Sequence, residues 1–589
     1  MRIAKRDGLV SFGLIVMVSL ALWVPGKVGR TCADEMPRDV EGFTAPASGE
    51  HPRLFFRKAD LADLRKKAAT PHGQAIVKRL RFLLDGGDGT GFPTELNPNR
   101  GKQPDGSGKF NEQSPEGKTY TMFHGAGYGM LYQLTGEKKY ADLGRKAVEL
   151  ALEGQRDRDN RYSFRDPTGA LRSGPSLGAI AIAYDLNYEG WDDAFRKKVC
   201  EAIESYNEGR NLSLEELARG SRHNPGSNHW GPQIGGAALA LLAIRNDPGV
   251  DNAKIDKLLD TNAKAIVKQM TEGWGDHGWF AEGDGPGAIS SDTALVPAIQ
   301  AWKTAGGKDF ITPWPNVQWM TLKWVMLTLP PGGNKLYPKR GGYPHNVWAR
   351  NGMSGTGAFA QGFGAIDDEY MPALVWLYSH TFREKDAKAN EPFDTPGPYP
   401  HRAALALINW PFDVQEKNPA EVLPHAVMDT YAGHAMFRNR WQDGDDILVT
   451  TQLLDTRGNG TTKGGPVYIW GLGEQYTFSV SLTGKPTHFT GDKTGGVVSV
   501  SGASLGVDFS GKAGIEGLVV LAATNIRGNF KGDTTGKIQT QSVTAGDTTF
   551  VIATISSGKP PELKTAGDRK AMIGGATISY DGMNVTISK

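Results

Sequence analysis

Residues 132–147 read Tyr-Gln-Leu-Thr-Gly-Glu-Lys-Lys-Tyr-Ala-Asp-Leu-Gly-Arg-Lys-Ala. The stretch contains the end of one helix, a glycine at position 136 and the start of a second helix, because glycine readily adopts the left-handed conformation that ends helices. Tyr140 begins the apolar stripe of the second helix. A connection this short makes consecutive helices antiparallel. The stretch therefore predicts an α-hairpin as the unit from which this part of the chain is built.

The same pattern continues from about residue 55 to residue 410, where apolar residues recur at helical spacing with no credible strand between them. Short-looped antiparallel helices form either an open solenoid or a closed toroid, and the lack of a regular repeat favours the toroid. Helices are predicted at Leu61–Leu84, Thr121–Leu134, Lys138–Leu152, Ser176–Asn187, Asp192–Tyr206, Gln233–Arg245, Ile255–Met270, Ser291–Thr304, Val317–Leu329 and Asp368–His380.

After Pro424 the pattern changes to alternating apolar and polar residues rich in β-branched and aromatic side chains, which is typical of strands. Glycine and Asp/Asn turns separate the strands and no amphipathic helix is visible, so we expect an antiparallel sandwich. Strands are predicted at Asp446–Leu454, Tyr476–Leu482, Gly496–Val507, Gly517–Ala523, Thr548–Thr554 and Ala576–Ser588.

The predicted fold is thus a mainly α N-terminal (α/α) incomplete toroid followed by an all-β antiparallel sandwich. A length of 589 residues agrees with two domains. The proline-rich stretches around residues 391–400 and 415–424 predict the inter-domain connection. The expected division is a signal peptide at 1–33, the toroid at 34–410, a linker at 411–424 and the sandwich at 425–589.

The N-terminus has the anatomy of a secretory signal. Arg2, Lys5 and Arg6 precede the uncharged apolar run Leu9–Val24, and small residues at 31–33 offer a cleavage site. A membrane anchor is the alternative, but the run is short for a bilayer span. We therefore expect a periplasmic or secreted protein with no membrane span in the mature chain.

Charge and cysteine content exclude some classes of function. Sixty-six basic and 64 acidic residues give a formal charge of +2, which is too small for a general nucleic-acid-binding field. An acidic polymer would instead have to meet local basic groups. Cys32 would leave with the signal peptide, so Cys200 has no partner for an intramolecular disulfide.

Several stretches resemble the heparinase II/III-like and alginate-lyase-like polysaccharide lyases. Residues 132–147 are similar to their helix-turn-helix step, His51–Leu61 to their opening segment and Ala183-Tyr-Asp185 to an inner-helix signature, while Gly433–Trp441 is similar to the first strand of their β-domain. The resemblance implies the toroid-plus-sandwich fold and β-elimination on a uronic-acid polysaccharide. That reaction needs a group that neutralises the carboxylate, a base for the C5 proton and an acid for the leaving oxygen.

Ser227-Asn-His-Trp230 is the first candidate for this chemistry, because an amide beside an imidazole offers carboxylate neutralisation and proton transfer. By the resemblance Asn228 is the neutraliser and His229 the base or acid, with Trp230 available for sugar stacking. The alternative is that Asn228 caps the following helix.

Gly273–Gly287 is the second candidate, a glycine-rich loop crowded with titratable groups. The resembling lyases carry an Asp-Gly-aromatic-x-Glu-Gly stretch followed by a catalytic tyrosine. Here the stretch is present as His277-Gly-Trp-Phe-Ala-Glu282-Gly without that tyrosine, so His277 is the predicted substitute, with Trp279 and Glu282 at the substrate. A structural loop with solvated acids is the alternative.

The third candidate, at residues 339–350, combines arginines for carboxylate or sulfate with aromatic rings. Tyr343 is a second substitute for the missing tyrosine. The substrate-binding residues expected there are Arg340, His345, Trp348 and Arg350. A surface turn with incidental basic residues is the alternative.

The sandwich departs from the family, where a His-x-His-x-Asp pattern supplies a histidine and in some members metal ligands. The corresponding stretch, residues 455–465, has no histidine, so we expect no required metal or cofactor. His434 is a lesser candidate for the domain junction. Two other functions stay open: an inverting glycoside hydrolase using two of Asp276, Glu282 and Asp284, and a non-catalytic glycan-binding protein.

Overall fold

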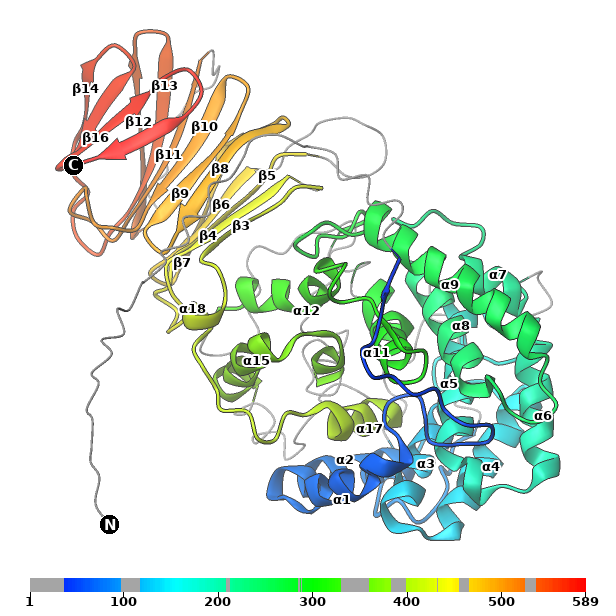
Figure 1. Cartoon of the computed structure of the whole chain (residues 1–589). Coiled ribbons are helices and arrows are strands. Elements are labelled where there is room, and N and C mark those ends of the chain that lie inside the picture. The colour runs from blue at the N-terminus through cyan, green and yellow to red at the C-terminus, as the bar shows by residue number, and fades with distance from the viewer. Residues whose placement is uncertain are drawn as a thin grey trace, which may run out of the picture. The chain divides into compact units, whose positions relative to one another are not determined.

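The computed structural model describes residues 36–96, 117–207, 212–283, 287, 289–329, 360–382, 399–431, 433–454, 466–524 and 536–589. Its α-helices are α1 (Leu61–Ala69), α2 (Pro71–Asp85), α3 (His124–Thr135), α4 (Lys138–Leu152), α5 (Ala170–Asn187), α6 (Asp193–Glu204), α7 (Leu214–Arg219), α8 (Trp230–Ile244), α9 (Asn252–Glu272), α11 (Val296–Thr304), α12 (Asn316–Leu327), α15 (Met371–Leu377), α17 (Pro400–Asn409) and α18 (Pro419–Val422). Figure 1 shows these helices in the N-terminal part of the chain.

The helices form a closed ring. Helix α3 packs on α5, α5 on α8 and α8 on α11; α11 then contacts the 3-10 turn Gly362–Ala365, which contacts α17, and α17 packs back on α2 and α3. All residues of α8 are buried and nearly all of α5, whereas α4, α6 and α9 bury only one face. This separation into buried and amphipathic helices confirms the predicted helical toroid.

Helices α5 and α8 approach unusually closely because glycines face each other. A Cβ on Gly236 would lie 1.9 Å from the backbone oxygen of Gly174, so any side chain there would separate the two helices. This contact brings the N-terminal turns of α5 and α8 side by side.

Two of the sequence motifs that resemble the lyases meet inside the toroid. His51 Nδ1 lies 2.7 Å from Asp185 Oδ1, and the backbone N–H groups of Arg53 and Leu54 also donate to Asp185. His51 and Arg53 contact Asp247 as well. The opening segment is therefore held on α5 by a buried network of paired charges, as buried ionised groups require.

The prediction of one helix over Leu61–Leu84 is wrong, because the chain breaks between α1 and α2. Thr70 is extended (ψ 155°) and its hydroxyl accepts the Gly73 N–H, while Pro71 opens α2. A residue before proline avoids the helical conformation, and proline suits a first helical turn. The apolar stripe continues across this break, so the spacing of apolar residues alone does not reveal that the helix ends there.

The C-terminal part is all β and antiparallel. Its strands are β3 (Ala426–Asp429), β4 (His434–Arg438), β5 (Leu448–Gln452), β6 (Pro466–Gly471), β7 (Glu474–Ser481), β8 (Pro486–Asp492), β9 (Gly495–Val500), β10 (Ala503–Asp508), β11 (Gly517–Thr524), β12 (Ile538–Ala545), β13 (Thr548–Ile555), β14 (Leu563–Gly567), β15 (Lys570–Ile573), β16 (Ala576–Tyr580) and β17 (Val585–Ser588). Strands β1 (Arg38–Asp39) and β2 (Lys308–Asp309) pair separately.

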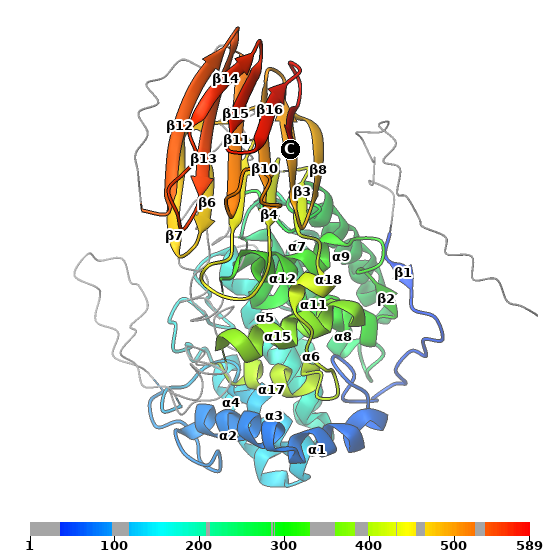
Figure 2. The same ribbon diagram turned by 90° about the vertical axis from the view of Figure 1, so that its left-hand side faces the viewer.

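The strands make three stacked sheets rather than two (Figure 2). The six-stranded sheet, in the order β12-β13-β11-β10-β9-β8, packs one face on the five-stranded sheet β3–β7 and the other on the four-stranded sheet β14–β17. Along β11, Val519 and Leu521 enter the first core while Leu518, Val520 and Ala522 enter the second. The predicted antiparallel sandwich is confirmed, with an additional layer.

Two predicted strands are hairpins in the structure. Gly496–Val507 divides at Gly502 (φ 78°) into β9 and β10, and Ala576–Ser588 divides at 581–584 into β16 and β17, where Asp581 accepts the Met583 and Asn584 N–H groups. Side-chain capture of this kind closes a tight turn. Alternation on both sides of each turn makes the pair resemble a single strand.

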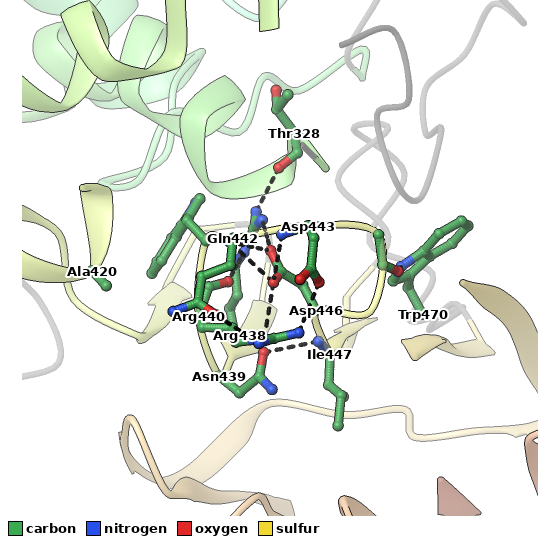
Figure 3. A network of polar contacts seen from close by, with 12 residues as sticks. Thr328, Ala420, Arg438, Asn439, Arg440, Gln442, Asp443, Asp446, Ile447 and Trp470 are labelled. Carbon is green, nitrogen blue, oxygen red and sulfur yellow. Dashed lines mark hydrogen bonds and ion pairs between the residues drawn. The ribbon is translucent and has the colours of Figure 1, made fainter. Parts of the chain in front are cut away.

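The toroid and the β-domain share a buried polar contact (Figure 3). Arg438 on β4 is fully buried, pairs with Asp446 at 2.9 Å, and donates to the carbonyl oxygens of Met326 and Thr328 at the end of α12. Trp441 donates its indole N–H to the Val325 carbonyl. Burial lowers the pKa of Arg438 to about 10 and raises that of Asp446. Arg438 therefore stays charged at neutral pH and caps α12 from the β-domain.

In the part of the chain that the structure describes, no helix has the length and apolar character needed to cross a bilayer. The predicted signal peptide lies outside the described residues.

Candidate active site

Asn228 and His229 lie where the chain enters α8. His229 is the N-cap residue and no side chain caps the helix, so the alternative that Asn228 is a helix cap is wrong. The backbone N–H of Asn228 donates to Glu282 Oε2 at 2.8 Å. Among the described residues the amide of its side chain has no hydrogen-bond partner, which leaves it available to a ligand.

The imidazole of His229 is neutral at physiological pH. Burial, then the neighbouring His223 and Arg172, lower its pKa to about 4. Its ring stacks on that of His223, with centroids 4.1 Å apart, and its Nδ1 is buried without a hydrogen-bond partner in the described residues. A neutral imidazole accepts a proton, so His229 has the protonation state of a base.

Arg172 is a half-buried cation with no ion pair among the described residues. It lies in the first turn of α5, next to the entrance of α8, and its Nε is buried without a partner. A positive charge at a helix N-terminus is opposed by the helix dipole. Burial lowers its pKa further, although an arginine stays charged. An anion supplied from outside would relieve both penalties.

Tyr162 lies within electrostatic range of Arg172. Burial and the charge of Asp159 raise the pKa of its hydroxyl, so it stays protonated well into the alkaline range. Asp159 itself is bound by Arg161 through two contacts, Nε–Oδ1 at 2.9 Å and Nη2–Oδ2 at 2.6 Å. The ion-pair partner of Asp159 is therefore Arg161 and not Arg172.

The first turn of α17 extends the same end of the ring. Tyr399 donates its hydroxyl to Asp157 at 3.5 Å, and burial holds its pKa well above the usual range. His401 stacks on Phe123 with centroids 3.6 Å apart. Arg402, like Arg172, has a buried Nε without a partner in the described residues. Two such arginines at helix N-termini make this end of the toroid suited to an acidic ligand.

The second candidate loop is held by the β-domain. Asp429 on β3 accepts the backbone N–H groups of His277 at 2.9 Å and Trp279 at 3.3 Å. Thr430 donates its N–H and its hydroxyl to Asp276, each at 2.8 Å. Because the same loop carries Glu282, which binds the Asn228 N–H, the β-domain supports the entrance of α8.

Trp279 packs the domain junction. Its ring stacks on His434 with centroids 3.5 Å apart, the Lys323 ammonium lies 4.7 Å from its centroid, and it is 5 % exposed. His434 thus lies at the domain junction, where the sequence placed it as a lesser candidate. His277 is partly exposed, contacts Asp276 at 3.2 Å and lies edge-on to Trp319. Trp279 has no open face for sugar stacking, whereas His277 can meet solvent.

The structure brings together Asn228, His229 and Glu282, and places His277 and Trp279 at the adjoining junction. Trp230 is buried and donates its indole N–H to the Ala265 carbonyl of α9, so its ring faces away from that group. The predicted site residues Arg340, Tyr343, His345, Trp348 and Arg350 lie outside the described residues.

The carboxylates of the hydrolase alternative have other partners. Both oxygens of Asp276 bind Thr430, and although burial opposes ionisation, its hydrogen bonds to His277 and Thr430 bring its pKa below the usual value. Glu282 accepts the Asn228 N–H. Asp284 lies outside the described residues. An ionised, doubly bonded Asp276 is poorly suited to act as a general acid.

Arg172 and Tyr162 were not among the predicted residues. The only local signal was Arg172 in the first turn of a strongly apolar helix, where a cation is disfavoured. The proximity of Arg172 to His229 comes from the α5–α8 contact, which no local pattern shows.

Within the described residues no group of three or more His, Cys, Asp and Glu side chains is arranged to hold a metal ion. The sandwich stretch at 455–465 is not among them.

Gly275→Ala is expected to destabilise the protein by about 1–3 kcal/mol, because a Cβ there would lie 2.0 Å from Asp429 Oδ1. Urea denaturation measures the change, and Gly444→Ala, with nothing within 4 Å, is the control. In an Asp429→Ala background the added effect should shrink, since the clash is gone. An undiminished effect would mean that the strain lies elsewhere.

The acidic limb of kcat/KM is expected near pH 4, since protonating His229 removes the proton acceptor as pH falls through its pKa. His229→Ala should lose most of the activity together with this limb. A pH profile on an acidic polysaccharide checks it. A limb near neutral pH that disappears in His277→Ala would assign the base to the loop instead.

No family model matches this sequence, and no curated protein sequence matches it. Solved structures that this chain matches include heparinase III, with 10% identity and a TM-score of 0.43 over 90% of this chain and 95% of that one. Heparan sulfate lyase HepC from Pedobacter heparinus has 11% identity and a TM-score of 0.42 over 90% and 94% of the two chains. The Streptomyces coelicolor A3 chondroitin AC lyase, in complex with chondroitin sulphate, has 10% identity and a TM-score of 0.37 over 89% and 76%.

Proposed function

We propose that this protein is an exported polysaccharide lyase that cleaves a uronic-acid-containing polysaccharide by β-elimination. The observation that carries the proposal is the unmatched charge of Arg172 beside the neutral His229 and the unpartnered amide of Asn228. A carboxylated sugar supplies the anion that this arrangement lacks.

Each step of the elimination has a residue in the required protonation state. Arg172 and Asn228 would bind the uronate carboxylate and stabilise the charge that grows on it when C5 loses its proton. His229, neutral above about pH 4, would accept that proton. Tyr162, whose pKa is raised, would keep its proton to donate to the leaving glycosidic oxygen. Neighbouring groups with pKa values displaced in opposite directions are a common basis for acid and base assignments.

The decisive experiment uses the mature protein and a panel of acidic polysaccharides, following both the absorbance of the unsaturated uronide and the release of reducing ends. A lyase produces both signals in equal amounts. New reducing ends without the unsaturated product would replace the proposal with hydrolysis. Binding without either product would make the protein a non-catalytic glycan-binding protein.

Arg172→Met is expected to lower kcat/KM by about tenfold to a hundredfold, the usual value of a charge-assisted hydrogen bond. Arg172→Lys keeps the charge without the planar fork and should recover part of the loss. Folding stability should not fall, because the arginine has no ion pair to lose among the described residues. Steady-state kinetics and thermal denaturation of both variants test this, and unchanged kcat/KM in Arg172→Met would remove the residue from the site.

A further inference from the structure

A second cationic surface lies beside the candidate site, on the outer side of α8. It is a pocket of about 520 Å³ between the end of α7, the loop that follows it and α9. This volume is within the roughly 300–1,000 Å³ that is common for ligand sites. The side chains that give the pocket its character are those of Arg219, Arg222, Trp230, Lys264 and Lys268.

The pocket has four cations in its lining and no acid. Lys264 is paired with Asp260 at 2.6 Å, and Arg219 lies 4.0 Å from Glu216, but both acids are outside the lining. Lys268 has no ion pair with any described residue, and its ammonium lies 5.8 Å from the Trp230 ring centroid. The net charge of the whole chain is only +2, so the four cations around this pocket are a local concentration of positive charge.

The floor of the pocket is rigid. The Trp230 indole is fixed by its hydrogen bond to α9, and Gly220 (φ 66°) lies so close that a Cβ there would approach Trp230 Cε2 to 2.5 Å. Arg222 adopts a left-handed backbone conformation (φ 64°), which is unfavourable for a residue with a side chain. Strained residues of this kind cluster at ligand-binding positions.

Arg222 connects the pocket to the candidate active site. It directly precedes His223, whose ring stacks on His229, and its charge contributes to lowering the pKa of His223, which burial lowers most. Arg222 therefore lines the pocket and also adjoins, through His223, the residue that stacks on His229.

We propose that this pocket is an accessory binding site for the acidic saccharide chain, where sulfate or carboxylate groups distant from the cleaved bond are held by Lys264, Lys268 and Arg222. The assignment to a saccharide rests on the proposed lyase function, whereas the preference for an anion rests on the pocket itself. The site binds long chains and is not reached by short ones.

The test compares Lys264→Glu/Lys268→Glu with Lys254→Glu/Lys257→Glu, a control with the same charge change on the same helix outside the pocket. The pocket variant should raise KM for a polymeric substrate about tenfold, by removing and reversing two contacts. Its kcat/KM for a tetrasaccharide of the same polymer should match the wild type. The difference should fade in 0.5 M salt, where the Debye length falls to about 4 Å from about 10 Å at 0.1 M. Equal polymer KM values for the two double variants would overturn the proposal.

Direct binding separates this inference from the proposed function. If the wild type releases no unsaturated product, binding of fluorescently labelled chondroitin sulfate and polygalacturonate is measured instead. Weaker binding by the pocket variant than by the control supports the site, with the two probes distinguishing sulfate from carboxylate, and equal binding overturns it. Tighter binding of a single-stranded oligonucleotide of equal charge would overturn the saccharide assignment.

Discussion

Asn228→Ala is expected to lower the turnover of the acidic polysaccharide by about a hundredfold or more, the loss typical when a preorganised donor to a developing negative charge is removed. The amide has no partner in the described residues, and its backbone N–H keeps its bond to Glu282 after the substitution. Thermal stability should therefore barely change. Initial rates of unsaturated product formation, with melting temperatures alongside, measure both quantities.

Asn224→Ala is the matched control, an exposed asparagine in the same loop, and it should keep wild-type turnover. Near-normal turnover in both Asn228→Ala and His229→Ala would mean that the entrance of α8 is structural. The search would then move to Arg340 and Tyr343 in the third candidate cluster.

Arg438→Met is expected to destabilise the protein by about 3–5 kcal/mol, because it removes the fully buried ion-pair partner of Asp446, leaves that carboxylate only the longer contact to Arg440, and uncaps the end of α12. The arginine at this position donates to a carboxylate and to three backbone carbonyl oxygens at once, whereas a methionine of similar length donates to none of them. Equilibrium denaturation in urea measures the loss.

Arg440→Met is the control for this experiment, since Arg440 also contacts Asp446 but is partly exposed. Its effect should stay within about 1 kcal/mol, as for other solvent-accessible pairs. Replacing Asp446 as well, in Arg438→Met/Asp446→Leu, should recover part of the stability because the buried carboxylate that lost Arg438 is gone. Equal losses for Arg438→Met and Arg440→Met would show that burial is not the reason.

Local sequence patterns predict the bounds of an element correctly where its apolar stripe begins and ends with the element. Helix α4 has the predicted bounds, Lys138–Leu152, since Gly136 and the charged surface positions mark it clearly. The errors occur where a stripe continues through a turn, at Thr70–Pro71 and at Gly502. The third sheet was also missed, because alternation shows that a residue faces a core but not which of two cores it faces.

The site likewise contains residues that the sequence predicts and residues that only the structure reveals. Asn228, His229 and Glu282 were visible as unusual polar groups near glycines, but their contact joins segments far apart in the chain. Arg172 was not predicted, because what distinguishes it is a buried guanidinium Nε with no hydrogen-bond partner among the described residues. That feature becomes visible only once α5 is packed on α8. Asp429 is an ordinary strand residue in sequence, and its role comes from the two backbone N–H groups that it accepts across the domain junction.

Closure of the helical ring also determines the order in which the chain can fold. Helices α2 and α3 are made early, yet the surface that they present to α17 is covered only after residue 409 has been synthesised. Because contacts between distant segments form slowly, an incomplete chain exposes apolar helix faces throughout synthesis. The ring of helices is therefore complete only after α17 has been made, and under the export that we propose this interval would leave the chain unfolded for translocation.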